Sequence, residues 1–203
     1  MYYHSLSTSP LLPTPPPLPF DPVCRSYHKL SESFSLHPEL LSSASSGLCL
    51  DIGSAPGGWS QCLVHHGATS VVAVDPGAMV APCLPPGRGL QAGAVTHVRC
   101  KLEDGASALE DLLGDELFDC VVCDANIHPL VLIAIVCSEL VGRLVKSNAL
   151  LNLTVKLTNG KDVPKEVLEE KLKEGGYDMI SYRWLFSNGR KERNLVCRRV
   201  RSA

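Results

Sequence analysis

The sequence lacks any hydrophobic run that is long enough to cross a membrane. Its longest uninterrupted apolar stretch, Leu130 to Cys137, is far shorter than the roughly 20 residues that a spanning helix needs. Charged residues make up 20% of the 203 positions and hydrophobic residues 45%, which suits one globular domain with a sizeable core. This composition excludes a membrane-spanning protein, a fibrous protein and a wholly disordered chain. We therefore expect a soluble protein.

The N-terminal part lacks the charged-then-apolar segment of a secretory signal, and the nine cysteines are an odd number. Both observations argue against the disulfide framework of a secreted protein. We expect a reducing compartment, the cytoplasm, with free and mostly buried thiols. Cys120 and Cys123 have the spacing of a redox pair, but they lie within a predicted strand, where residues three apart point to opposite faces. Core packing is the favoured interpretation of both.

The sequence also lacks the second close pair of cysteines or histidines that a zinc site needs. The candidate ligands are His65 with His66, His97 with Cys100, and His128, and they do not form a recognised set. We predict no metal.

Lysine and arginine are missing from the first 22 positions, and eight of the fifteen prolines fall within the first 40. Residues 1–22 show neither helical nor strand periodicity, so we expect a Pro/Ser-rich disordered leader followed by one folded domain over residues 23–203. The leader is similar to an organelle transit peptide in its Ser and Thr content but lacks the basic residues that such peptides usually carry. Import into an organelle stays open.

The net charge of −2 hides an asymmetry. Residues 183–203 carry seven Lys or Arg against the single acid Glu192, which gives +6 there and leaves −8 elsewhere. This basic C-terminal stretch has two interpretations: a face that contacts a polyanion such as RNA, or a solvated edge strand.

From Leu48 onward, short apolar runs alternate with helical patterns, which is typical of a parallel sheet covered by helices. The expected strands are 48–52, 71–74, 96–100, 118–123, 149–157, 179–185 and 194–200, and the expected helices are 58–66, 106–113, 130–145 and 164–173. The turn Ser187 to Arg190 favours an antiparallel hairpin between the last two strands. The fold class is therefore α/β, a doubly wound, mostly parallel sheet with a C-terminal antiparallel hairpin.

The most informative stretch is Asp51-Ile-Gly-Ser-Ala-Pro-Gly-Gly-Trp-Ser60, where the first expected strand gives way to the first helix. Ligands of open parallel sheets bind at the carboxyl ends of the strands, and glycines there allow close approach of the backbone. The spacing of Gly53, Gly57 and Gly58 differs from the dinucleotide fingerprint, and the Lys-Ser/Thr pair of a P-loop is missing. We expect a cofactor other than a nicotinamide dinucleotide or ATP.

This stretch, through Gln61, resembles the first motif of the FtsJ/RrmJ-type ribose 2′-O-methyltransferases, D-[LIM]-G-[SA]-x-P-G-G-[WF]-[ST]-Q. The resemblance extends over roughly residues 25–201 and implies a Rossmann-like methyltransferase domain that binds S-adenosylmethionine. It implies a cofactor pocket formed by Asp51, Gly53, Ser54, Pro56, Gly57, Gly58 and Trp59.

Two further acids are candidates for cofactor binding. Asp75 ends the second expected strand, where a carboxylate can accept two hydrogen bonds from the ribose diol. After the third strand, Glu103 and Asp104 are both candidates for the adenine side, and we favour Asp104.

The same family uses a Lys-Asp-Lys-Glu tetrad, and each member has a counterpart here. The segment Arg25 to Glu32 resembles the family segment that ends in K-L-x-E and supplies Lys29. Asp124 follows the fourth expected strand, Lys156 lies in the fifth, and Glu192 precedes the last. The resemblance thus implies Lys29, Asp124, Lys156 and Glu192 as catalytic residues.

Methyl transfer from a sulfonium to a ribose hydroxyl is an in-line displacement, so oxygen, carbon and sulfur must be aligned. A lysine can take the hydroxyl proton only if desolvation or a like charge lowers its pKa from about 10.4. We expect Lys29 to supply that like charge beside Lys156. In this hypothesis Lys156 activates the 2′-hydroxyl, Asp124 lies near the methyl group and orients Lys156, and Lys29 and Glu192 position them.

Within the family, three stretches resemble the RlmM-like branch, which modifies a cytidine ribose of large-subunit ribosomal RNA. They are Cys123-Asp124 followed by Pro129, residues 152–157, and Glu192 with Arg198-Arg199. The sequence departs from the usual D-M-x-P after the fourth strand, where it has Asp-Ala-Asn-Ile-His-Pro.

The function implied is methylation of RNA ribose, with ribosomal RNA as the favoured partner and transfer RNA or an mRNA cap as alternatives. The main rival is a non-catalytic scaffold in ribosome assembly that binds cofactor or RNA. A methyltransferase for proteins or small molecules is disfavoured, because it needs no lysine to activate a sugar hydroxyl. Tyr182, Trp184 and Phe186 could stack on an unpaired base, but their alternation along a strand favours core packing.

Overall fold

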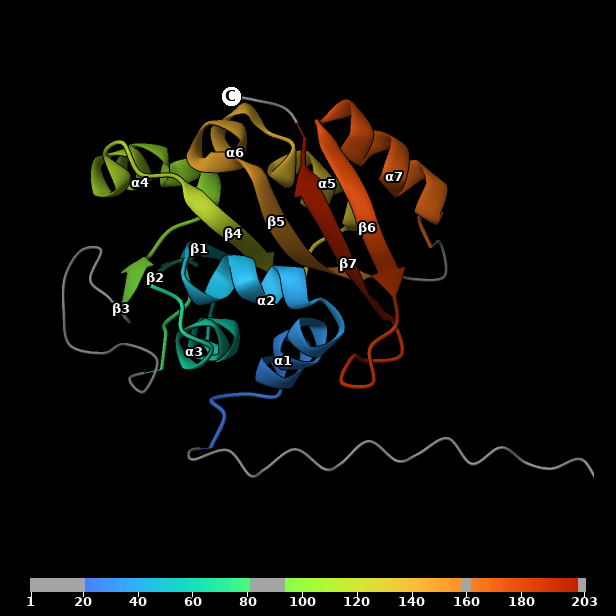
Figure 1. Cartoon of the computed structure of the whole chain (residues 1–203), viewed down its shortest axis with the longest axis horizontal. Coiled ribbons are helices and arrows are strands. Elements are labelled where there is room, and N and C mark those ends of the chain that lie inside the picture. The colour runs from blue at the N-terminus through green and yellow to red at the C-terminus, as the bar shows by residue number, and fades with distance from the viewer. Residues whose placement is uncertain (1–20, 81–93, 158–161, 201–203) are drawn as a thin grey trace, which may run out of the picture.

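The computed structural model describes residues 21–80, 94–157 and 162–200. Its centre is a seven-stranded sheet in the order β3-β2-β1-β4-β5-β7-β6 (Figure 1). The strands are β1 Leu48–Ile52, β2 Ser70–Val74, β3 Ala94–Val98, β4 Phe118–Cys123, β5 Val145–Lys156, β6 Tyr177–Arg183 and β7 Glu192–Arg199. The first five pair in parallel, whereas β7 is antiparallel to both of its neighbours. The predicted fold class, with its C-terminal antiparallel hairpin, is confirmed.

Helices cover both faces of the sheet (Figure 1). One layer contains α1 Ser26–Leu36, α2 Pro38–Ser45 and α3 Gly58–His65, and the other contains α4 Ala106–Leu113, α5 Pro129–Val136, α6 Glu139–Leu144 and α7 Lys165–Glu174, with a 3₁₀ turn η2 at Leu102–Asp104. Ligands of such sheets bind at the carboxyl ends of the parallel strands.

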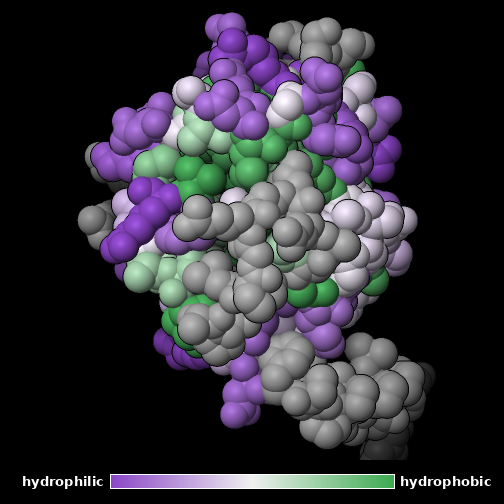
Figure 2. Space-filling model, turned by 90° about the vertical axis from the view of Figure 1, so that its left-hand side faces the viewer, coloured by the Kyte–Doolittle hydropathy of each residue, from purple (hydrophilic) through white to green (hydrophobic). Residues whose placement is uncertain are grey.

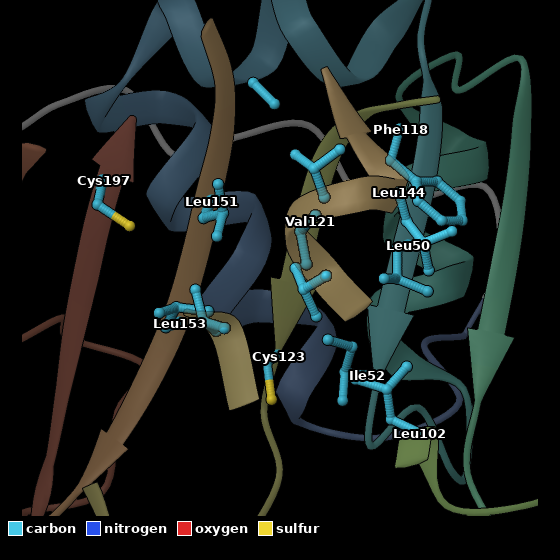
Figure 3. Close-up of a cluster of buried hydrophobic side chains, with 14 of the residues drawn as sticks. Leu50, Ile52, Leu102, Phe118, Val121, Cys123, Leu144, Leu151, Leu153 and Cys197 are labelled. Atoms are coloured by element: carbon cyan, nitrogen blue, oxygen red, sulfur yellow. The ribbon is translucent and has the colours of Figure 1, made fainter. Parts of the chain in front are cut away.

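The hydrophobic core has two parts, one on each face of the sheet. Figure 3 shows Leu50, Val121 and Leu151 from neighbouring strands in the part beneath α4 to α7. Cys123 lies in this part and Cys120 in the other, so the two sulfurs belong to opposite faces, as predicted. The described cysteines are all free thiols, five of them buried and three half-buried.

Two helices at the start of the domain escaped sequence analysis. No periodicity pointed to α1 and α2. In the structure α1 buries Tyr27, Leu30 and Phe34, and α2 buries Leu40 and Ala44, in the core on that face of the sheet. The helix expected over residues 130–145 was also wrong, since it is broken in two. The first helix, α5, ends at Val136. Ser138 caps the start of α6, where its hydroxyl accepts a hydrogen bond from Val141 N, and β5 already begins at Val145. The third strand lies two residues earlier than predicted.

The basic C-terminal stretch is not an edge strand. β7 lies between β5 and β6, and β6 forms the edge. Arg199 is buried and donates a hydrogen bond to the Val145 carbonyl, whereas Arg190 and Lys191 are exposed at the hairpin turn. Arg199 therefore has a structural contact, whereas Arg190 and Lys191 are open to solvent.

An apolar groove of about 760 Å³ lies beside α5 on the outer face, lined by residues such as Leu102, Ala106 and Val131. Figure 2 shows exposed hydrophobic residues among hydrophilic ones on the side of the molecule that carries α4. Within the described parts of the chain, no helix is both long and apolar enough to span a bilayer. The predicted leader lies outside the described residues, except for positions 21 and 22.

Candidate active site

The loop after β1 lies where the strand order reverses, between β2 and β4. Gly53 has a φ of +73°, which favours glycine, and a Cβ there would lie 2.7 Å from the Ala125 Cβ. The loop therefore packs directly on the residue that follows Asp124. This contact places the predicted cofactor loop next to the predicted catalytic residue Asp124.

A cavity of about 160 Å³ lies against this loop. Its lining includes five of the predicted cofactor residues and one predicted catalytic residue: Asp51, Gly53, Ser54, Pro56, Trp59 and Asp124. Among the described residues, the buried Ser54 hydroxyl has no hydrogen-bond partner. An unsatisfied buried hydroxyl is costly, so this wall is suited to a ligand with polar groups.

Asp51 supplies a buried carboxylate to the cavity. Its side chain is 1% exposed and accepts a 2.6 Å hydrogen bond from Ser60 Oγ. Burial, with smaller contributions from Asp124 and Asp75, raises the pKa of Asp51 to about 7, although the Ser60 hydrogen bond opposes the shift. A cationic group in the cavity would favour the ionised form of this carboxylate.

The segment before α1 closes one side of the cavity. Trp59 Nε1 donates a 2.7 Å hydrogen bond to the Ser26 carbonyl, and a Cβ on Gly58 would lie 2.5 Å from both Cys24 Sγ and Ser26 Oγ. The absence of a side chain at Gly58 thus lets Cys24 and Ser26 pack against it. Neither Gly58 nor Gly57 lines the cavity. Cys24 and Ser26 do line it and were missed, because only folding brings a segment 30 positions earlier in the chain to the loop.

The two other predicted cofactor acids lie in different settings. Asp75 accepts hydrogen bonds from Ala55 N and Gly77 N, so it is tied to the glycine loop at the end of β2. Asp104 and Glu103 are both exposed on η2 and do not line the cavity. The adenine-side role of Asp104 stays a prediction.

All four predicted catalytic residues meet in one charged network. Lys156 Nζ lies 2.8 Å from Asp124 Oδ1 and 2.7 Å from Glu192 Oε1. Lys29 Nζ lies 3.2 Å from Asp124 Oδ2 and 3.0 Å from Glu192 Oε2. Their side chains are 12–17% exposed, so the network is accessible from one side only. Residues from α1, β5, β7 and the end of β4 thus form a cluster with two positive and two negative charges.

The electrostatics of this cluster correct one expectation. Burial would lower the pKa of Lys156, but Asp124 and Glu192 outweigh it and raise that pKa above its usual value. Burial would likewise raise the pKa of Glu192, but hydrogen bonds from Lys156, Gly189 N and Lys29 lower it to about 2. The expected lowering of the Lys156 pKa by Lys29 is therefore wrong, because two carboxylates contact Lys156 Nζ directly and stabilise its charged form.

A buried polar cluster holds α1 in place behind Lys29. Ser33 Oγ donates a 2.6 Å hydrogen bond to Asn152 Oδ1, and Asn194 Nδ2 donates a 2.7 Å bond to the same oxygen. Asn152 lies on β5 and Asn194 on β7, the two strands that carry Lys156 and Glu192. One turn of α1 is therefore fixed to both strands, which sets the position of Lys29.

The comparison with protein families gives a match to the FtsJ-like methyltransferase model over residues 22–176. The chain belongs to the FtsJ-like methyltransferase family. Its cofactor is S-adenosylmethionine, and the cavity at the glycine loop, with its unpaired Ser54 hydroxyl and its carboxylate Asp51, fits a polar, cationic molecule of this kind. The match does not distinguish the RlmM-like branch, which stays a prediction.

Solved structures share the fold at low sequence identity. A protein described as a ribosomal RNA methyltransferase from Plasmodium falciparum matches with a TM-score of 0.57 and 17% identity over 89% of this chain and 99% of that one. Aeropyrum pernix fibrillarin, solved with bound S-adenosylmethionine, has a TM-score of 0.60 and 12% identity over 85% and 76%. A protein described as a hemolysin from Lactococcus lactis has a TM-score of 0.65 and 17% identity over 87% and 88%. No curated protein matches the chain.

Proposed function

We propose that this FtsJ-like enzyme transfers a methyl group from S-adenosylmethionine to a ribose 2′-hydroxyl of RNA. The observation that carries the proposal is the position of Asp124. This one carboxylate lines the cofactor cavity and also accepts hydrogen bonds from both lysines of the network. This shared carboxylate supports a reaction in which a cofactor bound in the cavity would adjoin the residues that would hold a hydroxyl.

The cofactor supplies an electrophilic methyl group on a positively charged sulfur. The residues of the network must hold the accepting oxygen in line with that methyl group and receive its proton. The Lys156 ammonium, whose pKa is raised, is suited to donate a hydrogen bond to the 2′-oxygen and so orient it. The hydroxyl becomes strongly acidic as the new C–O bond forms, and Asp124 is placed to accept its proton.

Ribosomal RNA is the substrate that we favour. The resemblance to the RlmM-like branch supports it, as does the similarity in fold to the Plasmodium falciparum protein described as a ribosomal RNA methyltransferase. The exposed Arg190 and Lys191 beside Glu192 add positive charge at the edge of the network, where a phosphate backbone would pass.

The reaction is tested by incubating the protein with labelled S-adenosylmethionine and total RNA. Alkaline hydrolysis cleaves RNA only next to a free 2′-hydroxyl, so ribose methylation leaves the label in alkali-stable dinucleotides. We expect this result, together with a 2′-O-methyl nucleoside after nuclease digestion. Label in a base-methylated nucleoside would contradict the proposed reaction. Cofactor binding without any transfer to RNA would favour the scaffold interpretation.

A further inference from the structure

Two aromatic rings are exposed at the tip of the β6–β7 hairpin, contrary to the expectation that they pack in the core. Phe186 is 86% exposed and Trp184 is 49% exposed, while Leu185 between them is buried. The two rings lie 6.3 Å apart between centroids at an angle of 70°. Alternation along the chain thus places both rings on the outer face, and a pair of adjacent exposed aromatic rings is typical of an interaction site.

The hairpin tip is fixed to α1 rather than loosely attached. Glu32 accepts hydrogen bonds from Phe186 N at 2.7 Å and from Ser187 N at 2.9 Å, and Ser187 Oγ lies 2.5 Å from the same carboxylate. Figure 1 shows α1 beside this turn. The position of the Phe186 ring is therefore set relative to the helix that carries Lys29.

A depression of about 660 Å³ lies between α1 and the tip, and its size is in the range of small-molecule sites. Its lining residues include the aromatic Phe186, the basic Arg25, His28, and the hydroxyl-bearing Ser31 and Ser187. It also contains Glu32, but both oxygens of that carboxylate already accept hydrogen bonds from the hairpin.

These groups match the parts of a nucleotide. An exposed aromatic ring can stack on an unpaired, unstacked base, and a guanidinium can pair with a phosphate. Arg25 and Glu32 lie four residues before and three residues after Lys29 on the same stretch of chain, so the depression adjoins the charged network. A nucleotide bound in the depression would therefore be next in the RNA to the nucleotide whose ribose is methylated at the network.

We propose that this depression binds an unpaired nucleotide that flanks the methylated one, with its base stacked on Phe186 and its phosphate paired with Arg25. The inference rests on the proposed function for the identity of the polymer. It makes the enzyme selective for single-stranded RNA or loops, because a base within a duplex cannot reach the ring.

The test is direct binding of a fluorescein-labelled, mixed-sequence RNA decamer to the protein, without any methyl transfer. Phe186→Ala should weaken binding about tenfold, and Phe186→Tyr should keep it near wild type, since stacking needs a ring of either kind. Phe186 is 86% exposed, so its removal leaves folding intact. The matched control is Val131→Ala on α5, which removes another exposed apolar side chain, 50% exposed, and should bind like wild type.

Trp184 offers a second readout, because the other tryptophan of the chain, Trp59, is buried. Unlabelled single-stranded decamer should quench the fluorescence of the wild type but not of Trp184→Phe, and the matching duplex should quench it far less. Equal binding by Phe186→Ala and Val131→Ala, equal affinity for duplex and single strand, or no binding of the decamer by the wild type would each overturn the proposal. RNA binding that depends on Phe186 in a protein that methylates no ribose would uphold the subsite and refute only the reaction.

Discussion

Lys29 and Lys156 approach the same carboxylate oxygens: each Nζ lies within 3.2 Å of Asp124 Oδ1 and within 3.1 Å of Glu192 Oε1. The four residues come from positions as far apart as 29 and 192, and each is positioned by a different helix or strand. The two ammonium groups are thus held near each other by the acids between them. Loss of one acid changes the environment of both lysines.

The first prediction concerns the pKa of Lys156. Glu192 is one of the two acids that raise it, so Glu192→Gln should lower it. The alkaline limb of the pH profile of kcat should then move toward lower pH. The control is Glu174→Gln, which changes an exposed acid that pairs only with Lys171 among the contacts described. An unmoved limb in Glu192→Gln would show that Lys156 does not titrate in the reaction.

The second prediction concerns stability and Asp51. Because the folded state raises the pKa of Asp51 from 3.8 to about 7, it retains a proton that the unfolded chain releases. Its stabilising contribution is therefore complete below about pH 4 and is lost as the pH rises through about 7. Asp51→Asn removes the buried charge and should raise the melting temperature above pH 7 by about 2–4 °C per kcal/mol gained. The gain should shrink toward pH 4, and a gain independent of pH would contradict the account.

The same carboxylate predicts a pH dependence of cofactor binding. S-adenosylmethionine is cationic, so its affinity for the wild type should weaken as the pH falls below about 7 and Asp51 takes up a proton. Titration calorimetry between about pH 6 and 8 should show this slope in the wild type and not in Asp51→Asn. Equal pH dependence of the affinity in the wild type and in Asp51→Asn would show that a group other than Asp51 titrates.

The buried polar cluster behind Lys29 predicts a contrast between two serines of α1. Ser33→Ala removes the buried hydrogen bond to Asn152 Oδ1, which then accepts only from Asn194 Nδ2 among the described contacts, and should reduce the free energy of unfolding by about 0.5–1.5 kcal/mol. Ser35 is exposed, and within the described parts of the chain its hydroxyl bonds only the Ser31 carbonyl of its own helix, so Ser35→Ala should change stability by less than about 0.5 kcal/mol. Urea denaturation measures both, and equal effects would mean that the cluster does not hold α1.

Gly53 predicts a local failure of the cofactor loop. Gly53→Ala meets both a positive φ and the Ala125 Cβ at 2.7 Å, so it should abolish cofactor binding. Gly114 also has a positive φ, of 57°, but a Cβ there contacts nothing within 4 Å. Gly114→Ala therefore isolates the backbone strain, about 1–2 kcal/mol, and should bind cofactor normally. Equal loss of binding in the two variants would point to general destabilisation.

The sheet was predictable because its central strands β1, β2 and β4 are buried on both faces and therefore form short apolar runs in the sequence. The charged network was predictable because each member stands next to a recognisable element: Asp124 after β4, Lys156 at the end of β5 and Glu192 at the start of β7. Lys29 depended on the family resemblance, since α1 itself gave no clear period. What brings the four together is the sheet order, which the local sequence patterns do not specify.

Three features escaped prediction for physical reasons. The break at Ser138 depends on a single hydroxyl that caps a new helix, within a run that is otherwise apolar. The exposure of Phe186 follows from the hydrogen bonds of Glu32, a contact between positions 154 residues apart. The raised pKa of Lys156 follows from the balance of four charges in space, in which the two acids outweigh desolvation.

The most direct test of the account is single-turnover methyl transfer to RNA by the wild type, Lys156→Ala and Lys146→Ala, with cofactor affinity measured in parallel. Lys146 is the matched control, because it lies on the same strand and pairs with Asp119 away from the network. We predict that Lys156→Ala lowers the rate about 100-fold or more at unchanged cofactor affinity, while Lys146→Ala transfers like the wild type. A Lys156→Ala variant that transfers at the wild-type rate, or two lysine variants that lose activity equally, would contradict it.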